Sequence, residues 1–279
     1  MRMRIRRRRR KGILALRILL LLIGLVLIGI PFLWIVLTAF KDPVAADASP
    51  PMFISPLTLS NFDALFQDGY AKSLLNSVII TTLSTGFTLI FGIPAGYAFA
   101  RGKFRGRNFF GAFLLFSRMV PPVIYIIPLF LFFHLLNLIG TFTGMTLAYL
   151  TGLLPFTVWM SASYFQGVPV ELEDAARVDG CSRLRSFISI SLPLALPGIV
   201  SVGLLIGIAA WGEYFIPLIL GGFSTEPATV GIVNFVGIDG SSWGPMAAGA
   251  LCLIVPVFLA TLVAQRSLID GLTSGALKG

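Results

Sequence analysis

The sequence predicts an all-α membrane protein whose chain crosses the bilayer six times. Hydrophobic residues make up 56% of the 279 residues and charged residues only 12%, and the mean hydropathy is +0.91. A soluble core could not bury so large an apolar excess, so an ordinary soluble enzyme is excluded. The net charge of +9 is concentrated in short segments beside apolar runs, which indicates membrane topology rather than a nucleic-acid-binding surface.

Six apolar stretches approach the ~20 residues that a helix needs to cross the hydrocarbon layer. They lie at roughly 14–37, 74–100, 109–133, 145–165, 196–220 and 243–263. The stretches are continuous rather than alternating, and lipid cannot satisfy an open backbone, so helices are the expected spanning elements. We therefore divide the chain into a basic cytoplasmic N-terminus at 1–13, a six-helix transmembrane domain at 14–265 and a cytoplasmic C-terminal tail at 266–279.

Every predicted span contains proline, which removes a backbone donor and can kink a helix. Two interpretations stay open: the prolines shape a static bundle, or they allow the helices to rock. The prolines are Pro31, Pro94, Pro121, Pro122, Pro128, Pro155, Pro197, Pro217 and Pro256.

The orientation of the chain follows from the distribution of lysine and arginine. A cytosolic N-terminus places 18 of the 21 basic residues on the cytosolic side, leaving Lys41 and Lys72 outside and Arg118 within a span. The opposite orientation would violate the positive-inside bias almost completely. We expect both termini in the cytosol, and we expect the basic N-terminal run to contact anionic lipid headgroups rather than nucleic acid.

This orientation places the connection at 168–193 in the cytosol. Its sequence predicts a short helix, a break and a second short helix. Pro169 suits the first turn of a helix, where no backbone donor is needed, and Gly180 suits a left-handed end. Ser182 can cap a second short helix, which we expect to stop before Pro193.

One face of the first short helix is apolar and small. Leu172, Ala175, Ala176 and Asp179 recur at i, i+3, i+4 and i+7, and charged residues surround them. Such a helix is typical of a segment that docks into a groove on a soluble partner.

This connection resembles the EAA loop of bacterial ATP-binding-cassette importer permeases. The matching residues are Asp174-Ala175-Ala176, then Gly180, then Ile190-Ser191-Leu192-Pro193 at the family spacing. The resemblance implies a coupling helix that docks into a cleft on a cytosolic ATPase subunit. Asp174 stands where glutamate is usual, so either Asp174 or the neighbouring Glu173 supplies the carboxylate. The implied coupling residues are Leu172, Glu173, Asp174, Ala175, Ala176, Asp179, Gly180, Ile190, Leu192 and Pro193.

Other motifs resemble the carbohydrate-importer branch of this family, of the maltose type. They are Asn61-Phe62, Asn76-Ser77, Gly96-Tyr97-Ala98-Phe99-Ala100-Arg101, Phe104-Arg105-Gly106, Met119-Val120-Pro121, Ile127-Pro128-Leu129 and Trp211-Gly212-Glu213-Tyr214. The resemblance implies a type I importer fold in the bacterial cytoplasmic (inner) membrane. It implies as partners a second permease forming a heterodimer, two cytoplasmic ATPase subunits and an extracytoplasmic substrate-binding protein.

The same resemblance implies that ATP and Mg bind the partner ATPases, and that this chain binds no cofactor or metal and is not an enzyme. No Walker-type glycine loop followed by Lys-Ser or Lys-Thr occurs in the sequence. The glycine-containing tail with Thr273, Ser274, Gly275 and Lys278 resembles the end that reaches between the two ATPase subunits.

Few polar residues lie in the predicted spans or at their outer ends. Arg118, Trp211, Glu213 and Tyr214 are candidates for the translocation path. Arg118 can instead anchor the partner permease, and Glu213 can simply be solvated at the interface. By the resemblance, Asn234 and Phe235 belong to an external loop that contacts the binding protein.

The sequence leaves the transported solute open. Sugars, oligosaccharides and glycerol phosphodiesters are all compatible with the resemblance, and an importer for another solute such as an amino acid is the nearest alternative. An ion-driven secondary transporter is a weaker alternative, since Glu213 is the only carboxylate within a predicted span and no internal repeat is evident. A membrane enzyme is weaker still, because no catalytic cluster appears.

Overall fold

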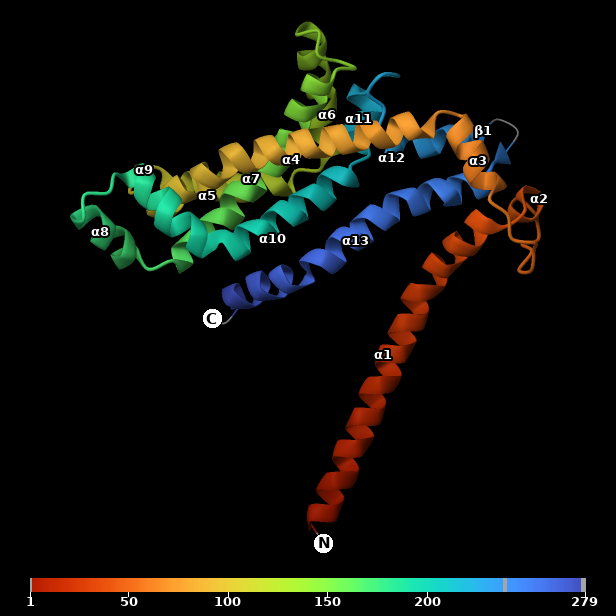
Figure 1. The fold of residues 1–279 in the computed structure, drawn as a ribbon, viewed down its shortest axis with the longest axis horizontal. Coiled ribbons are helices and arrows are strands. Elements are labelled where there is room, and N and C mark those ends of the chain that lie inside the picture. The colour runs from red at the N-terminus through yellow and green to blue at the C-terminus, as the bar shows by residue number, and fades with distance from the viewer. Residues whose placement is uncertain (1, 238–239, 277–279) are drawn as a thin grey trace. The chain divides into compact units, whose positions relative to one another are not determined.

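The computed structural model describes residues 2–237 and 240–276 and is almost wholly helical (Figure 1). The chain divides into two compact units. The first comprises Met1–Asp68 and Asn234–Cys252, and the second comprises Gly69–Val233 and Leu253–Gly279.

The first unit begins with one long helix and ends with a short hairpin and the start of the last helix. Asn61, which is buried, ties the end of α1 to α3, because its amide nitrogen donates to the carbonyls of Ala39 at 3.0 Å and Lys41 at 2.7 Å. The elements are α1 (Arg2–Phe40), α2 (Pro43–Ala46), α3 (Ser60–Gln67), β1 (Val236–Gly237), β2 (Gly240–Ser241) and the first part of α13 (Trp243–Ala276).

The second unit is a helical bundle in which α4, α7 and α10 run side by side (Figure 1). Two short helices, α8 and α9, lie at the end of the bundle where α4 terminates. The elements are α4 (Tyr70–Arg101), α5 (Arg107–Met119), α6 (Pro122–Leu135), α7 (Phe142–Gly167), α8 (Val170–Val178), α9 (Arg183–Ser186), the π-helix η1 (Phe187–Ser191), α10 (Leu192–Trp211), α11 (Phe215–Leu220) and α12 (Ala228–Gly231), with the 3₁₀ helix η2 (Ile232–Phe235) leading out of the unit.

The described residues include five helices that are long and apolar enough to cross a membrane, or six if one bent pair counts as a single span. The five are Arg17–Phe40, Tyr70–Arg101, Phe142–Gly167, Arg183–Trp211 and Trp243–Val263. The all-α polytopic fold that the sequence predicts is thereby confirmed.

The third predicted span, at 109–133, is not one straight helix. It consists of α5 and α6, which meet at an angle of 98°. Val120 precedes a proline and is extended, with φ −76° and ψ 116°, and Pro121 is also non-helical, with ψ 139°. Two consecutive prolines therefore break the span, because the ring of each disfavours a helical residue before it.

The fifth span has different limits from the predicted 196–220. It runs from Arg183 to Trp211 through α9, η1 and α10, and Gly212 to Tyr214 separate it from α11. The prediction that the second short helix stops before Pro193 is wrong. A π turn precedes Pro193, with the Leu192 N–H donating to the Phe187 carbonyl, and this change of register lets the chain continue past a residue that lacks a donor.

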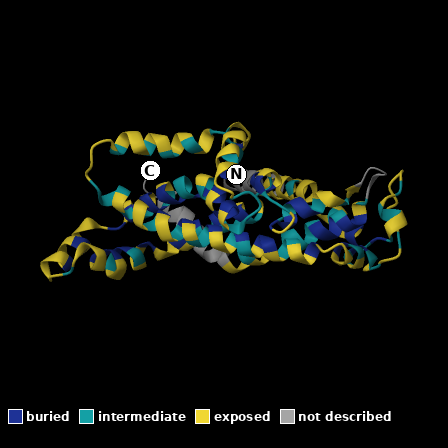
Figure 2. Ribbon diagram, turned by 90° about the horizontal axis from the view of Figure 1, so that it is seen from above, coloured by how far each residue is buried: buried dark blue, intermediate teal, exposed yellow. Residues whose placement is uncertain are grey.

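Small residues bring α4 and α7 into close contact. Gly92 and Gly96 on α4 lie against Thr157 and Ser161 on α7, so both helices contribute a pair spaced i, i+4. Such spacing allows membrane helices to approach closely and to pack by van der Waals contact. Elsewhere the large apolar side chains are commonly exposed, and Figure 2 shows exposed positions (yellow) along the helices with buried positions (dark blue) between them, as expected of a surface that faces lipid.

Gly96→Ala should destabilise the second unit. A Cβ at Gly96 would meet Ser161 Oγ, and it would lie 2.9 Å from the Val158 carbonyl oxygen and 3.0 Å from the Ala162 nitrogen. The last two are backbone atoms that cannot yield easily, so we expect a loss of roughly 1–3 kcal/mol, measured as thermal unfolding in detergent. Gly86→Ala on the same helix is the matched control, since nothing lies within 4 Å of its Cβ. An equal loss at both positions would contradict the close approach.

Candidate functional site

From Pro169 to Ser182, the segment between α7 and α10 adopts the local structure that the sequence predicts. Pro169 directly precedes α8, Glu171 and Glu173 lie in its first turn, and Arg177 lies in its last turn, each charge matching the helix dipole. Gly180 follows α8 with φ +91°, a conformation that glycine adopts without strain. Ser182 caps α9 by accepting a hydrogen bond from the Arg185 N–H at 3.3 Å.

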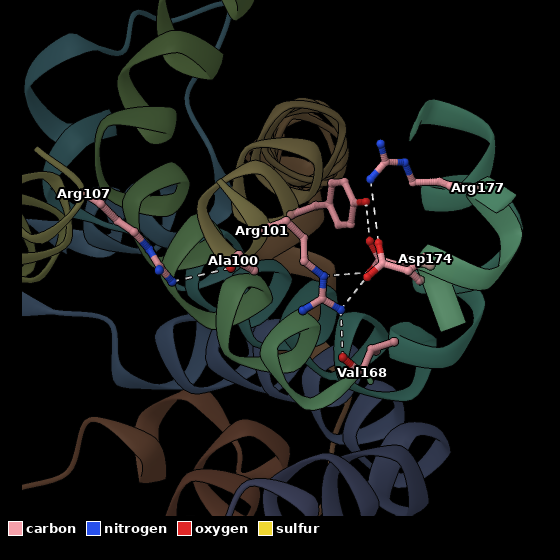
Figure 3. Close-up of polar contacts among 9 residues, drawn as sticks. Ala100, Arg101, Arg107, Val168, Asp174 and Arg177 are labelled. Carbon is pink, nitrogen blue, oxygen red and sulfur yellow. Dashed lines mark hydrogen bonds and ion pairs between the residues drawn. The ribbon is translucent and has the colours of Figure 1, made fainter. Parts of the chain in front are cut away.

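Glu173 points inward and is fully bonded, with only 7% of its side chain exposed. Its Oε1 accepts from Arg101 Nε at 2.8 Å and from Ser191 Oγ at 2.7 Å, and its Oε2 accepts from the Tyr97 hydroxyl at 2.7 Å. Arg101 Nη2 also donates to the carbonyl of Val168 at 2.8 Å, as Figure 3 shows. We call Tyr97, Arg101, Glu173 and Ser191 the Glu173 anchor.

The anchor keeps Glu173 ionised. Burial alone raises the pKa of this carboxyl, but the hydrogen bonds from Ser191, Tyr97 and Arg101 and the positive charge of Arg101 outweigh it and hold the pKa below its ordinary value. The anchor is therefore in place at neutral pH, and it is lost only when the pH falls through this lowered pKa.

Glu173 and Ala176 define the inner side of α8, since both are buried. The opposite side carries Glu171, Ala175 and Val178 at i, i+4 and i+7, and Val178 is 88% exposed. The small apolar face that the sequence predicts is thus divided, because Ala176 turns inward while Ala175 turns outward.

Asp174 is the outward carboxylate of the pair that the sequence could not separate. Its side chain is 63% exposed and pairs with Arg177 at 3.7 Å (Figure 3). An exposed pair of this kind contributes little to stability, so Asp174 stays available for another contact. Leu172 is 45% exposed on the flank of α8, and Asp179 and Gly180 follow the helix and are exposed.

The remaining predicted coupling residues lie away from α8, where the connection enters the bundle. Ile190 is half-buried within η1, and Leu192 packs against a buried cluster that includes Phe165 and Phe187. Pro193 is exposed at the start of α10. These three residues support the second half of the connection rather than the outer surface of α8.

Sequence reasoning missed the partners of Glu173. Tyr97 and Arg101 are spaced i, i+4 at the end of α4, and both lie in a motif that carries the family resemblance, but no local pattern links them to residue 173. Ser191 lies in η1, 18 residues after Glu173. Tertiary packing alone joins the three.

Arg118 contacts its own chain. Its Nη1 donates to the carbonyl of Gly152 at 3.1 Å, and its guanidinium lies 5.0 Å from the centre of the Phe156 ring. Both partners belong to α7, so α7 holds the end of α5 beside the break before α6.

Glu213 has a structural partner as well. Its Oε1 accepts from the backbone N–H groups of Phe215 at 3.0 Å and Ile216 at 3.2 Å, which caps the start of α11. Tyr214 occupies the non-helical position before α11, and its ring centre lies 6.0 Å from that of Phe215. The carboxylate therefore shapes the break between α10 and α11.

Trp211 lines a partly open cavity of about 240 Å³ in the second unit. Its Nε1 donates to the carbonyl of Leu253 at 3.0 Å, which fixes the ring. The cavity is mostly apolar and lined by Thr81, Gly203, Leu204, Gly207, Ile208, Trp211, Pro256, Val257 and Ala260.

Asn234 and Phe235 end the 3₁₀ helix η2 and belong to the first unit. The carbonyl of Phe235 accepts from the Ser242 N–H at 3.0 Å. Thr273, Ser274 and Gly275 continue α13 as helical backbone, but their side chains, and Lys278 entirely, lie outside the described residues. Within the described residues no group of three or more His, Cys, Asp or Glu could hold a metal ion.

Residues 89–267 match the family described as the binding-protein-dependent transport system inner membrane component. The chain belongs to that family, and it is therefore a multi-pass membrane permease and not an enzyme. This membership decides against the secondary transporter and the membrane enzyme that the sequence left as alternatives.

Individual relatives cover nearly the whole chain. The trehalose/maltose transport system permease protein MalG of Thermococcus litoralis is 34% identical over 277 residues, covering 95% of this chain and 98% of the relative. The trehalose transport system permease protein SugB of Mycobacterium tuberculosis is 32% identical over 254 residues, covering 90% and 92%.

Solved structures show the same fold. A chain of a bacterial ABC transporter involved in the import of the acidic polysaccharide alginate superposes with a TM-score of 0.77 at 23% identity, covering 90% of this chain and 94% of that one. A chain of the MetNI methionine ABC transporter superposes with a TM-score of 0.60, covering 72% and 95%. The type I importer fold that the resemblance implies is confirmed. As a permease of an ABC importer, the chain works with an ATPase and a substrate-binding protein.

Proposed function

We propose that this chain is one half of the permease of an ATP-driven importer for a sugar or oligosaccharide, and that α8 is the element that its ATPase moves. The observation that carries the proposal is the outward side of α8, held in place by the buried Glu173 on its inner side. A second permease completes the pathway as a heterodimer, and two ATPase subunits lie below it. ATP and Mg bind those subunits.

The outer surface of α8 suits a groove on a soluble subunit. Ala175 is small enough to let another backbone approach, Val178 supplies apolar area, and Asp174 with Arg177 supplies a charged rim. Leu172, Asp179 and Gly180 flank this surface. The tail with Thr273, Ser274, Gly275 and Lys278 is a second contact with the ATPase subunits.

Transport in this scheme needs no covalent chemistry from the chain. Closure of the ATPase pair on ATP displaces α8, and the bundle changes from inward-facing to outward-facing. Trp211, Tyr214, Glu213 and Arg118 belong to the half of the pathway that this chain contributes. Asn234 and Phe235 contact the binding protein at the external surface.

The sugar specificity rests on the relatives. Their names state transport of trehalose and maltose, diacetylchitobiose and arabinooligosaccharides. A sulfoquinovosyl glycerol permease is also 32% identical, which keeps glycosylated glycerols within the same class. An amino acid is the alternative class, since the MetNI methionine transporter shares the fold.

Ala175→Arg should abolish binding of the ATPase without affecting insertion of the permease. A long charged side chain on the outer side of α8 blocks close approach, while nothing in the buried side of the helix changes. The measurement is co-purification of a tagged ATPase with the co-expressed permease pair. Arg105→Glu is the control, because this exposed residue lies on the connection between α4 and α5 and not on α8. Undiminished co-purification with Ala175→Arg would contradict the proposed docking surface.

The native Cys181 tests the orientation. It is partly exposed, and directly follows Gly180 at the end of the α8 segment. A membrane-impermeant maleimide should label it in inside-out vesicles but not in intact cells, because we place α8 and both termini in the cytosol. Cys181→Ser removes this signal and leaves Cys252, which lies within a spanning helix. Labelling of Cys181 from outside intact cells would show that the topology is the reverse of the one we propose.

Uptake by the reconstituted importer, with its binding protein, tests the solute class. We expect ATP-dependent uptake of at least one of radiolabelled trehalose, maltose, diacetylchitobiose or arabinotriose, and none of methionine. Uptake of methionine together with no uptake of any of these sugars would contradict the proposed class.

A further inference from the structure

The Glu173 anchor joins three segments at a single carboxylate and a fourth through Arg101. Tyr97 and Arg101 come from the end of α4, Glu173 from α8 and Ser191 from the end of η1. Arg101 adds the fourth segment, since it also donates to the carbonyl of Val168, directly after α7. Both carboxylate oxygens are used, and every bond lies between 2.7 and 2.8 Å.

The anchor is the buried attachment of α8. Within that helix only Glu173 and Ala176 are buried, and the other residues are exposed. The connection from α8 to α4 runs through the long side chains of Tyr97 and Arg101 rather than through close backbone packing. A displacement of α8 must therefore either break these bonds or move the end of α4 with it. A charged carboxylate that leaves three donors unsatisfied is costly, so movement together is favoured.

The other side of the anchor leads into α10. Ser191 is the last residue of the π-helix η1, and α10 continues directly to Trp211. π turns inside longer helices are rare in proteins as a whole, and those that do occur frequently lie at functional sites. Since α10 has 20 residues, it extends about 30 Å from this end of the bundle to its far end.

Three aromatic rings pack together at this end of the bundle. The Tyr97 ring centre lies 4.6 Å from that of Phe187 and 5.4 Å from that of Phe165, and the last two lie 5.8 Å apart. Tyr97 therefore has two separable roles, because its ring packs in the cluster while its hydroxyl bonds Glu173.

We propose that Tyr97, Arg101 and Ser191 are positioning residues that hold Glu173, so that displacement of α8 by the ATPase is passed as one movement to α4 and α10. The inference rests on the proposed docking of the ATPase on α8. It adds that docking and transmission are carried by opposite sides of the same helix. Substitutions on the outer side of α8 abolish binding of the ATPase. Substitutions in the Glu173 anchor leave the ATPase bound, but its movement no longer reaches α4 and α10.

Tyr97→Phe and Glu173→Gln are the test variants. Tyr97→Phe keeps the ring in the aromatic cluster and removes one hydrogen bond to Glu173, so the fold is kept. Glu173→Gln keeps the shape of the side chain and removes the charge that Arg101 pairs with. Tyr164→Phe is the matched control, since Tyr164 packs beside the same cluster and its hydroxyl does not bond Glu173.

The readout is the thiol accessibility of Gly212→Cys, an exposed position directly after α10 where an added Cβ meets only an ordinary 3.5 Å contact, in a background with Cys181→Ser and Cys252→Ser. An impermeant maleimide is applied to the assembled complex without nucleotide and after trapping with ATP and vanadate. ATPase co-purification and ATP hydrolysis are measured on the same samples. This combination separates transmission from folding and from docking.

We expect trapping to change the labelling rate by about fivefold or more in the parent and in Tyr164→Phe, a typical size for coupling between distant sites. Tyr97→Phe and Glu173→Gln should retain ATPase and hydrolysis but lose most of that change. If Glu173→Gln does not insert, Tyr97→Phe decides the question alone.

Three outcomes would overturn the inference. They are a full response in Tyr97→Phe, an equal loss of response in Tyr164→Phe, and no response in a parent that binds and hydrolyses ATP. Failure of the docking surface itself would be seen separately, as ATPase binding that survives Ala175→Arg.

Discussion

One buried carboxylate organises the end of the bundle that meets the ATPase in our proposal. A charge removed from water must be paired and hydrogen-bonded, and Glu173 meets that requirement with bonds from α4 and η1. Since these bonds fix its direction, they fix which side of α8 faces outward. Ala175, Asp174 and Val178 are presented to a partner because Glu173 and Ala176 are held inward.

The rest of the bundle is held by a different kind of contact. Within lipid there is little hydrophobic drive between helices, so close packing of small residues replaces it. Gly92 and Gly96 on α4 meet Thr157 and Ser161 on α7 in this way, and Ser161 also donates to the carbonyl of Gly92 at 3.4 Å. The packing of α4 against α7 therefore depends on glycines, which have no side chain to keep the helices apart. The end of the bundle depends instead on a buried carboxylate whose hydrogen bonds are all made.

Proline shows why spans can be found from sequence while their shape cannot. Pro94 and Pro155 lie inside continuous helices, Pro121 and Pro122 produce the 98° bend, and Pro193 follows a π turn without interrupting its span. The residue is the same in each case, and the missing donor is the same. Whether the chain bends depends on whether neighbouring backbone can change its register, which packing decides.

The sequence by itself determined the class of protein, the apolar spans and the local form of the α8 segment, because hydropathy, helix capping and a glycine at positive φ act over a few residues. It also placed Asp174, Ala175 and Gly180 in a family motif. It could not distinguish Glu173 from Asp174, or show that Ala176 faces inward, because adjacent helical residues point about 100° apart and only the neighbours that surround them settle which side is buried. Tyr97 and Arg101 lie 76 and 72 residues before Glu173, and Ser191 lies 18 residues after it. Tertiary structure alone brought these three residues to the same carboxylate.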